Sequence, residues 1–488
     1  MDRILIVGAG PVGLTMALEL ARYGIGVRLI DRSPAPAATS RALVVWARTL
    51  ELLERSGETA DFLAAGLKAR GGTLRSGTRI LGGPRFADIP GRYAFALMIP
   101  QSETERLLTE RLGGCGGTVE RGVELIGFRE EPNRIRARLR HADGAVEEME
   151  TPYLLGCDGA HSAVRHGLGA AFPGEAQGDD WVLADVRLTG TRAPPPDELA
   201  IWLHRDGPFV VFPLPGGRAR LVATIGRSDP AQAPPQPTLA QMQALIDARA
   251  GGGFRALDPV WLSGFRINER KVAAYRTGRA FLAGDAAHVH SPAGGQGMNT
   301  GMQDAFNLAW KLALVLRGEA ADTLLDSYSP ERGAVGALVL RNATRLTALA
   351  TLSNPLAQAV RNLALRLALG VPAVRRTMAR TLGEIDIAYP AGALSAGRKG
   401  GTRLAPEDYA GAPPGAGAVP RFILHTADEA QGCTLAGRYP SLLEPAPRRS
   451  PAGGLLIVRP DGYVGFSGGA DAWPQAETWL AALRPGAG

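Results

Sequence analysis

Cysteine is scarce in this chain, with only Cys115, Cys157 and Cys433 among 488 residues. No two of them form a C-x-x-C pair, which excludes a disulfide framework and a cysteine zinc site. Such low use of cysteine suits a reducing compartment, so we expect the protein to be cytoplasmic.

Long hydrophobic runs and blocks of like charge are also missing. No uninterrupted apolar stretch approaches the roughly 20 residues that span a bilayer, so we predict no integral membrane segment. A strand pattern begins at residue 4, and we expect no signal peptide before it. The net charge of +7 is spread without a Lys/Arg block. This pattern argues against a nucleic-acid partner and suits a small anionic cofactor.

Glycine-rich loops are present at three places in the chain. The first loop follows an apolar run at residues 4–7 and precedes a helical pattern at residues 11–23, a second strand pattern at residues 27–30 and then Asp31. A strand–helix–strand unit with an acid about 20 residues on is typical of dinucleotide binding. The glycine fingerprint itself is Gly8-Ala9-Gly10-Pro11-Val12-Gly13.

Each glycine of the fingerprint has a predicted role. Gly8 permits the tight turn, Gly10 lets the backbone approach a pyrophosphate, and Gly13 lets the helix pack close to the strand. The pyrophosphate then faces free N–H groups at the start of the helix. Asp31 is placed to accept a hydrogen bond from a ribose hydroxyl.

Further polar residues extend this site. Arg32 follows the acid directly, and Arg41 precedes a helix, where it either binds a phosphate or is a solvated surface arginine. Ser102 and Glu105 form a capping box that predicts the start of another helix. Gln101 then lies just before that start, either pointing its amide toward the site or in a solvent-exposed loop.

The second loop follows a strand pattern at residues 153–156. Its sequence is Gly156-Cys157-Asp158-Gly159-Ala160-His161-Ser162. Asp158 is suited to hydrogen-bond the ribityl or nicotinamide side of a cofactor, and Arg165 is placed to pair with it. The alternative is an ordinary turn with a helix cap.

The third loop begins where a strand pattern at residues 279–283 ends in Gly284-Asp285. A glycine-rich segment follows, and Thr300 with Gln303 forms a capping box that predicts the start of a long helix. If a flavin ring lies there, the backbone N–H groups near Met298 and Asn299 face its pyrimidine edge and stabilise negative charge on the reduced ring.

Two histidines, His288 and His290, lie in this third loop. Neither has a third ligand at useful spacing, so we predict no metal site. We interpret both as structural histidines that hydrogen-bond to the backbone.

Together the three loops resemble the motifs of the single-component FAD-dependent aromatic hydroxylases, which have the para-hydroxybenzoate hydroxylase and phenol hydroxylase fold. Within that family the chain is similar to the bacterial subgroup that tailors polyketides or inactivates rifampicin. The resemblance extends to about residue 345, and its most specific part is residues 284–312.

The resemblance implies roles for residues along these loops. Asp31 would hold the adenosine ribose of a tightly but non-covalently bound FAD, and Arg41 would hold its pyrophosphate. Gln101 and Asp285 would contact the ribityl chain, and Asp158 would serve both FAD and a transient nicotinamide cofactor. The residues implied to line the isoalloxazine ring are Pro292, Gly295, Gly297, Met298 and Asn299.

The implied fold class is α/β. A Rossmann-type FAD-binding domain, discontinuous over residues 1–171 and 277–345, would be interleaved with a mixed-sheet α+β substrate domain at residues 172–276. Residues 346–390 would form an arginine-rich helical segment, whose arginines are either solvated or form a basic face toward a membrane. Residues 391–488 resemble the thioredoxin-like tail of the polyketide hydroxylases. That tail lacks C-x-x-C, so we expect a structural or dimer-stabilising role and no thiol chemistry.

The substrate domain contains four aromatic residues that either pack a ring substrate or belong to the core: Trp181, Trp202, Phe209 and Phe212. Strand patterns on both sides of a Pro-Gly-Gly turn, at residues 209–214 and 219–225, predict a hairpin there.

The resemblance implies an NAD(P)H-consuming monooxygenase. NADH or NADPH would reduce FAD, O₂ would give a flavin hydroperoxide, and a phenolic or other aromatic substrate would receive one oxygen atom. The cofactor carries this chemistry, so we assign no catalytic residue. Two alternatives stay open: a Baeyer–Villiger or ring-opening oxygenation, and a non-catalytic FAD-binding scaffold. The enzyme would act as a monomer or a homodimer.

Overall fold

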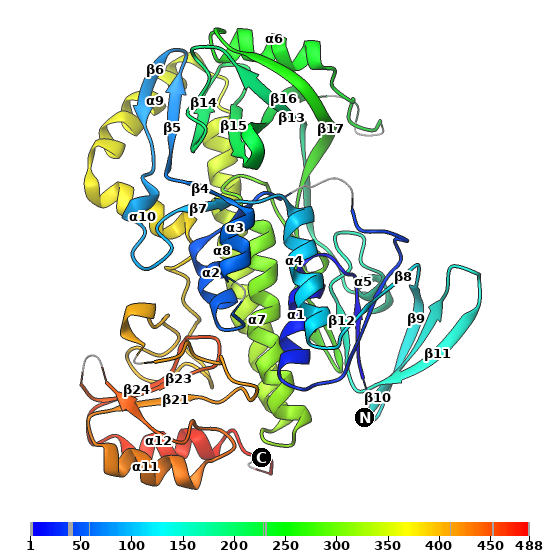
Figure 1. The fold of residues 1–488 in the computed structure, drawn as a ribbon, viewed down its shortest axis with the longest axis vertical. Helices are drawn as coiled ribbons and strands as arrows, with labels where there is room; N and C mark the ends of the chain where they lie inside the picture. The colour runs from blue at the N-terminus through cyan, green and yellow to red at the C-terminus, as the bar shows by residue number, and fades with distance from the viewer. Residues whose placement is uncertain are drawn as a thin grey trace.

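The structure is a computed structural model that describes residues 3–37, 42–57, 59–227, 229, 232–409, 411–450 and 453–486. Figure 1 shows a large sheet with helix α6 (Leu239–Arg249) at the top and the long helix α7 (Gly297–Leu316) in the middle. A smaller C-terminal unit, orange to red, lies beside the lower end of α7.

A six-stranded sheet forms the centre of the N-terminal half. Its order is β18-β19-β12-β1-β2-β8, and all neighbours are parallel except β18 and β19. Every residue of β1 is buried, as its continuous apolar run predicts for a strand covered on both faces. The strands are β1 (Ile4–Val7), β2 (Val27–Asp31), β8 (Val119–Arg121), β12 (Leu154–Gly156), β18 (Arg276–Thr277) and β19 (Ala280–Leu282).

Helices from distant parts of the chain cover this sheet. Helix α1 (Pro11–Arg22) packs against both α7 and α4 (Gln101–Gly114). Helix α7 is buried without interruption over residues 299–314, so it forms the interior of the molecule and not its surface. Shorter helices nearby are α2 (Ala47–Glu54), α3 (Thr59–Ala65) and α5 (Ala163–Gly167).

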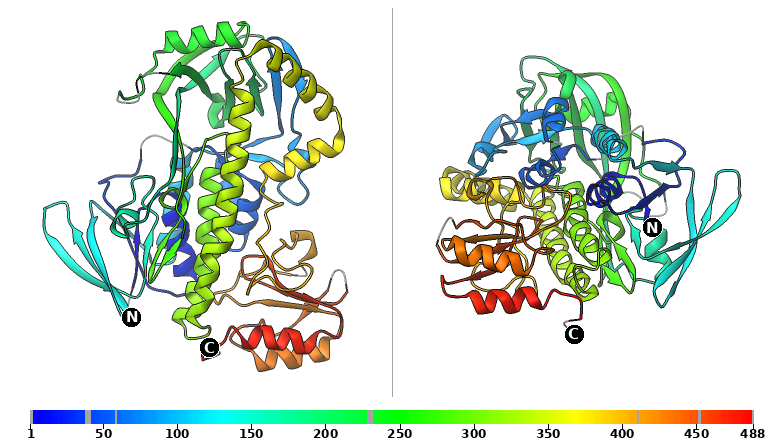
Figure 2. Two further views of the ribbon diagram at one scale, coloured as in Figure 1. Left: turned by 180° about the vertical axis from the view of Figure 1, so that it is seen from behind. Right: turned by 60° about the horizontal axis from the view of Figure 1, so that its bottom comes forward.

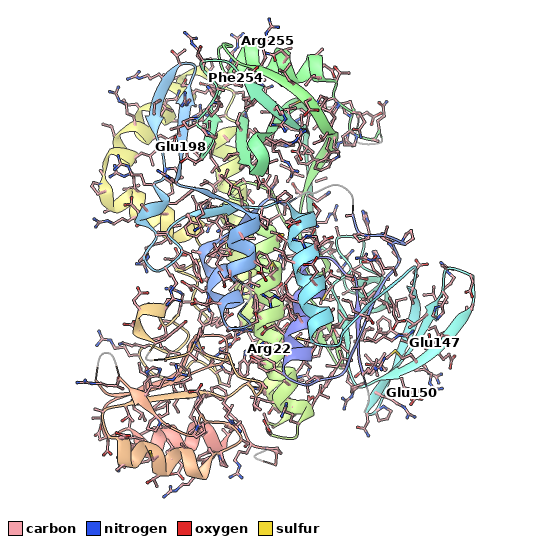
Figure 3. The ribbon with its side chains drawn as sticks, in the orientation of Figure 1. Arg22, Glu147, Glu150, Glu198, Phe254 and Arg255 are labelled. Atoms are coloured by element: carbon pink, nitrogen blue, oxygen red, sulfur yellow. The ribbon has the colours of Figure 1, made fainter. Side chains whose placement is uncertain are left out.

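Two three-stranded sheets flank the centre. One, in the order β3-β7-β4, consists of β3 (Val44–Val45), β7 (Ala96–Met98) and β4 (Leu67–Ala69). The other stands to one side in Figure 1 and consists of β9 (Glu124–Glu131), β10 (Arg134–Arg140) and β11 (Val146–Thr151). Glu147 and Glu150 on β11 are labelled in Figure 3. Arg28 of β2 donates to Glu147 at 2.6 Å, which ties this outer sheet to the central one.

An eight-stranded sheet, in the order β20-β17-β13-β16-β15-β14-β5-β6, lies above the centre. It extends beyond the predicted segment of residues 172–276, because β5 and β6 come from the N-terminal part of the chain and β20 lies within the third loop. The strands are β5 (Gly71–Ser76), β6 (Arg79–Gly82), β13 (Gly174–Thr189), β14 (Glu198–Trp202), β15 (Phe209–Leu214), β16 (Arg218–Arg227), β17 (Arg255–Lys271) and β20 (His288–Val289).

The predicted hairpin in this sheet is confirmed. Strands β15 and β16 pair in antiparallel fashion around η2 (Pro215–Gly217). Trp202 and Phe209 lie in a core cluster with residues of α6, so they are core residues. Phe212 lies on the opposite side of the strand and packs against the main core below.

Three helices follow the central unit: α8 (Tyr328–Ala350), α9 (Pro355–Gly370) and α10 (Pro372–Leu382). Two prolines mark the breaks between them, because Pro355 and Pro372 each stand at the first position of a helix. Short 3₁₀ turns occur at η1 (Phe86–Asp88), η3 (Gly284–Ala286), η4 (Asp322–Ser327) and η5 (Pro406–Asp408).

The C-terminal unit has a four-stranded sheet in the order β22-β21-β23-β24. Strand β21 is parallel to β22 and antiparallel to β23. A thioredoxin-like fold for this unit stays a prediction. Its elements are β21 (Ile423–Thr426), α11 (Glu429–Arg438), β22 (Arg448–Arg449), β23 (Leu455–Val458), β24 (Val464–Gly468) and α12 (Trp473–Ala481).

The C-terminal unit packs firmly against the central helices, and both views in Figure 2 place it beside α7. Trp310 of α7 shares a core cluster with Phe422, and their rings meet edge to face at 5.4 Å. Arg22, labelled in Figure 3, donates to the carbonyl oxygens of Gly415 and Gly417. No helix of the described residues is both long enough and apolar enough to cross a membrane.

Candidate functional site

The three glycine-rich loops leave one edge of the central sheet side by side. Strand β1 is paired in parallel with β12, and β12 with β19. The last pairs of these ladders join Val7 to Gly156 and Gly156 to Leu282. Three segments that are far apart in the sequence therefore meet at the carboxyl ends of neighbouring parallel strands, where ligands of α/β sheets bind.

The three glycines of the first loop differ in their surroundings. Gly8 has a φ of 98°, and a Cβ there would lie 2.4 Å from the Cys157 carbonyl oxygen. A Cβ at Gly13 would lie 1.8 Å from the Gly8 carbonyl oxygen. A Cβ at Gly10 would have no described protein atom within 4 Å. Two glycines thus allow the backbone to pack, and the third faces open space.

Helix α1 begins at this open space. It starts at Pro11 with no side-chain cap and no acidic residue in its first turn. Its first N–H groups have no partner within the helix, and the helix dipole adds positive charge there. At the end of β2, Asp31 accepts hydrogen bonds from the N–H of Ala9 at 2.7 Å and of Ser33 at 2.8 Å. The loop is therefore an anion-binding cradle with a carboxylate at its side.

The second loop is fixed to the third by an arginine. Asp158 accepts a hydrogen bond from the Val164 N–H, while its Oδ1 is buried with no partner among the described atoms. Burial raises the pKa of Asp158. The prediction that Arg165 pairs with Asp158 is not confirmed: Arg165 donates instead to the carbonyl oxygens of Ala286, at 3.1 Å, and Ala160, at 2.7 Å.

A buried carboxylate of α7, Asp304, fixes the third loop. It accepts a hydrogen bond from the Gly284 N–H at 2.9 Å and one from Arg332 Nε at 2.6 Å, and it lies 2.8 Å from His288 Nε2. Burial alone would raise the pKa of Asp304, but Arg332 and His288 beside it hold the pKa below its usual range. The expectation that His288 bonds to the backbone is therefore wrong.

Glycines let three backbone segments meet behind these loops. A Cβ at Gly284, which has a φ of 58°, would lie 2.7 Å from Cγ2 of Val12. A Cβ at Gly301 would lie at the same distance from that atom. The start of α1, the third loop and α7 therefore touch with only the Val12 side chain between them.

Helix α7 begins at Gly297, three residues before the predicted capping box. Thr300 and Gln303 do not cap it, because both side chains donate to the Glu384 carboxyl group, at 3.0 and 2.6 Å. The N-cap residue Gln296 makes no side-chain cap hydrogen bond, and the first turn contains no acid. The helix thus presents uncapped N–H groups and the positive end of its dipole.

The segment before α7 is held by its own side chains. Asn299 accepts a hydrogen bond from the Trp46 N–H at 2.8 Å and donates to the carbonyl oxygens of Val44 and Gly295. Trp46 Nε1 donates to the Gly294 carbonyl oxygen at 3.0 Å. The Asn299 side chain is therefore occupied within the protein. Of the residues predicted to line the ring, Pro292, Gly295, Gly297 and Met298 are exposed or partly exposed.

Two further groups near α7 have strongly shifted pKa values. His290 makes the predicted backbone contact, with Nδ1 at 2.8 Å from the Ser291 carbonyl oxygen, and burial lowers its pKa to about 4. Burial raises the pKa of Glu384 to about 8, although the hydrogen bonds from Thr300 and Gln303 act in the opposite direction. At neutral pH both groups are therefore uncharged. The described residues contain no cluster of His, Cys, Asp or Glu that could hold a metal ion.

A comparison with known families identifies the chain. The FAD binding domain family matches residues 2–343, which include all three loops and the whole of α7. The chain belongs to this family of flavoproteins.

Relatives of this flavoprotein are named as oxygenases. The 6-methylpretetramide 4-monooxygenase of Streptomyces rimosus is 37% identical and aligns with 100% of this chain and 95% of its own. A rifampicin monooxygenase of Streptomyces venezuelae is 35% identical over 80% of each chain. The structure of OxyS, an anhydrotetracycline hydroxylase from Streptomyces rimosus, matches 99% of this chain and 98% of its own, with 31% identity and a TM-score of 0.81. The protein is a flavin-dependent monooxygenase of the aromatic and polyketide hydroxylase family.

The structure brings together most of the predicted site residues of this flavin monooxygenase. Asp31 ends a strand of the central sheet, and Asp158 and Asp285 follow two others, all at the carboxyl edge of the sheet. Arg32 is exposed just beyond β2. Arg41 lies outside the described residues, so its phosphate contact stays a prediction.

Gln101 occupies a different place from the predicted one. It is the first residue of α4, and the N-cap is Pro100. The expected capping box does not form, because Glu105 accepts a hydrogen bond from Gln101 Nε2 at 2.8 Å. Gln101 Oε1 accepts one from the Ala42 N–H at 3.2 Å. The glutamine thus links α4 to the chain segment that leads into β3.

Three buried residues of the site escaped prediction: Asp304, Arg332 and Glu384. A single acid within the apolar pattern of α7 is a signal that could have identified Asp304, since buried carboxylates need partners. No local pattern marks Arg332 or Glu384, because each meets α7 only through the tertiary fold.

Proposed function

We propose that this monooxygenase holds FAD across the three loops and hydroxylates an aromatic substrate that lies between the isoalloxazine ring and the eight-stranded sheet. The observation that carries the proposal is the convergence of three loops and two uncapped helix starts at one sheet edge. Such a constellation suits a ligand that has a pyrophosphate at one end and an electron-accepting ring at the other.

The first loop and α1 would hold the pyrophosphate. Gly10 would let the phosphates approach the backbone, and the N–H groups that follow Pro11 would bind them. Asp31 would accept a hydrogen bond from the adenosine ribose. The open space at Gly10 supports this assignment, because no described protein side chain fills it.

The second and third loops would hold the ribityl chain and ring. Asp285, exposed at the sheet edge, would bind the ribityl hydroxyls. Asp158 has a buried oxygen without a partner, which is suited to accept a hydrogen bond from the cofactor side. The N–H groups at the start of α7 would face the pyrimidine edge of the ring.

When bound, FAD supplies the two-electron acceptance from NADH or NADPH and the reaction with O₂. The protein supplies the electrostatic environment. Negative charge on the ring would be stabilised by the α7 dipole, and neither the neutral His290 nor the neutral Glu384 opposes it. Phe212 and the sheet around it would exclude water from the reacting centre.

The substrate class follows from the relatives. Two of them are named for polycyclic substrates, 6-methylpretetramide and anhydrotetracycline. We therefore propose a phenolic, polycyclic aromatic compound of polyketide type for this chain. Trp181 is buried and stacks on Phe265, with ring centroids 6.3 Å apart, and we propose that this aromatic pair contacts such a ring system.

Purified protein tests the proposal directly. It should be yellow, release FAD on denaturation and oxidise NADH or NADPH faster when a phenolic polycycle is present. The product should be heavier by one oxygen atom. A colourless protein that takes up no FAD would overturn the proposal.

The same assay separates the two alternatives. A Baeyer–Villiger or ring-opening reaction also adds one oxygen atom but changes the connectivity of the ring, which nuclear magnetic resonance of the product detects. A non-catalytic scaffold would bind FAD and leave it oxidised after rapid mixing with NADPH.

A further inference from the structure

Helix α9 exposes an apolar stripe to solvent. The side chains of Leu356, Val360, Leu363 and Leu367 are 75%, 61%, 59% and 66% exposed. Their spacing of four, three and four residues places them on one face of the helix. Isolated exposed leucines are ordinary on protein surfaces, but a continuous stripe marks an interaction site.

Further exposed apolar side chains lie near the stripe in the chain. Of the fourteen large hydrophobic side chains exposed among the described residues, nine lie between positions 338 and 374. The members outside α9 are Leu338, Leu346 and Leu349 of α8 and, beyond the end of α9, Val371 and Val374. We call residues 338–374 with these side chains the α8–α10 surface.

The opposite face of α9 already packs against the protein. Leu369 is buried beside Leu74 and Leu81 of the eight-stranded sheet, and Asn362 donates to Ser76. Arg361 donates to the Leu349 carbonyl oxygen. The exposed stripe is therefore the second, outer face of a helix that is already fixed. Figures 1 and 2 show α9 at the outer margin of the molecule.

The charged side chains in the segment that contains the stripe are all arginines. Residues 332–383 contain no aspartate or glutamate and no lysine, but eight arginines. One of the eight, Arg332, is buried with Asp304, and Arg375 lies 3.9 Å from Asp88 on η1. The exposed arginines of the segment are Arg341, Arg345, Arg366, Arg376 and Arg380.

We propose that the α8–α10 surface docks on an anionic lipid bilayer, with α9 lying in the plane of the interface. A helix with leucines and valines on one side and arginines nearby binds there through both apolar burial and attraction to acidic headgroups. A second copy of the chain fits less well. A two-fold contact would bring two arginine sets together with no carboxylate from this segment to pair with them. This inference does not depend on the proposed reaction.

Vesicle flotation of the full-length, FAD-loaded protein tests the inference. We expect binding to vesicles of phosphatidylcholine with phosphatidylglycerol and much weaker binding to phosphatidylcholine alone. Added salt should reduce the binding, because it screens the arginines. The variant Leu363→Ser/Leu367→Ser should weaken the apparent affinity by about tenfold or more, and Arg366→Gln/Arg376→Gln should weaken it on the anionic vesicles.

A third variant, Val360→Ser, should also weaken binding to the anionic vesicles. Val260→Ser is its matched control, because the two valines are 61% and 60% exposed and only Val360 lies on α9. The control should bind like the wild type. FAD absorbance and the thermal midpoint report that each variant is folded. The inference is overturned if the wild type ignores anionic vesicles or if the leucine variant binds them equally well. It is also overturned if the leucine variant converts a dimer into a monomer in sedimentation, since the surface would then be an interface between copies.

Discussion

At the scale of single residues, alanine substitutions at two glycines of the first loop are expected to have different effects on the stability of the apoprotein. A methyl group at Gly13 meets the Gly8 carbonyl oxygen at 1.8 Å, so Gly13→Ala should separate α1 from β1 and cost about 1–3 kcal/mol or more. Gly10→Ala meets no described protein atom within 4 Å. It should leave the apoprotein as stable as the wild type and weaken FAD binding, because the methyl group occupies the space of the phosphates.

Thermal melts of both apoproteins, with FAD titrations followed by fluorescence, measure this contrast. If Gly10→Ala bound FAD like the wild type, the pyrophosphate would not lie at Gly10.

The shifted pKa of Glu384 predicts how the stability of the protein changes with pH. Its pKa is about 8 in the folded protein and near 4.5 when the chain is unfolded. The unfolded state therefore releases the proton first, and the carboxyl group destabilises the fold increasingly as the pH rises from about 4.5 to 8. Glu384→Gln removes this penalty. Its amide can donate to Gln303, whose Oε1 is buried without a partner.

The measurement is the thermal midpoint of the FAD-loaded protein from pH 5 to pH 9. We expect Glu384→Gln to be more stable than the wild type at pH 9 and to approach it toward pH 5. A difference that does not change with pH would show that the carboxyl group is not the titrating group.

At the scale of elements, α7 joins the cofactor site to the rest of the fold through Asp304. Replacing it by Asn leaves Arg332 as a buried cation without its counter-charge, which should cost about 3–5 kcal/mol. The third loop should also loosen, because the Gly284 N–H and His288 bond to the same carboxylate. Asp304→Asn is therefore expected to lower both the thermal midpoint and the FAD affinity.

Asp326→Asn is the control for this variant, since its carboxylate is exposed and pairs with Arg276 at 2.9 Å. An exposed ion pair contributes about 0–1 kcal/mol to the free energy of unfolding. Equal effects of the two substitutions would contradict a special role for the buried cluster.

The predicted strands agree with the structure better than the predicted helix starts do. Apolar runs identified β1, β12 and β19, because parallel strands covered on both faces are apolar throughout. The predicted helix starts at Ser102 and Thr300 were wrong in position. In both cases the polar side chains that could cap the helix bond elsewhere: Glu105 to Gln101, and Thr300 to Glu384. Local patterns find an element, but tertiary partners decide where it begins.

At the scale of the whole molecule, buried charges bind the C-terminal unit to the centre. Arg459 forms two hydrogen bonds to Glu331 of α8, at 2.6 and 2.9 Å, and also bonds to Asp461. Lys311 of α7 donates to the same glutamate at 2.8 Å. Burial lowers the pKa of Lys311 to about 8 even beside this acid. The unit is therefore part of the central fold and not a tethered appendage.

We predict that Arg459→Met destabilises the full-length protein by about 3–5 kcal/mol, because Glu331 and Asp461 lose their shared cation inside the protein. Arg438→Met, which removes an exposed pair with Glu477, should change the stability little. Urea denaturation followed by both tryptophan fluorescence and FAD release compares the two. A change in tryptophan fluorescence at a lower urea concentration than FAD release would contradict the coupling of this unit to the centre.

The order of strands β1, β12 and β19 has a consequence for synthesis on the ribosome. The dinucleotide-binding site starts at residue 8, but its third loop follows residue 282. The buried carboxylate that fixes this third loop is Asp304. A nascent chain must release about three fifths of its length before the vitamin-derived cofactor has anywhere to bind. Until then, strand β12 lacks its neighbour β19, and in a cell short of riboflavin the completed site would stay without its cofactor.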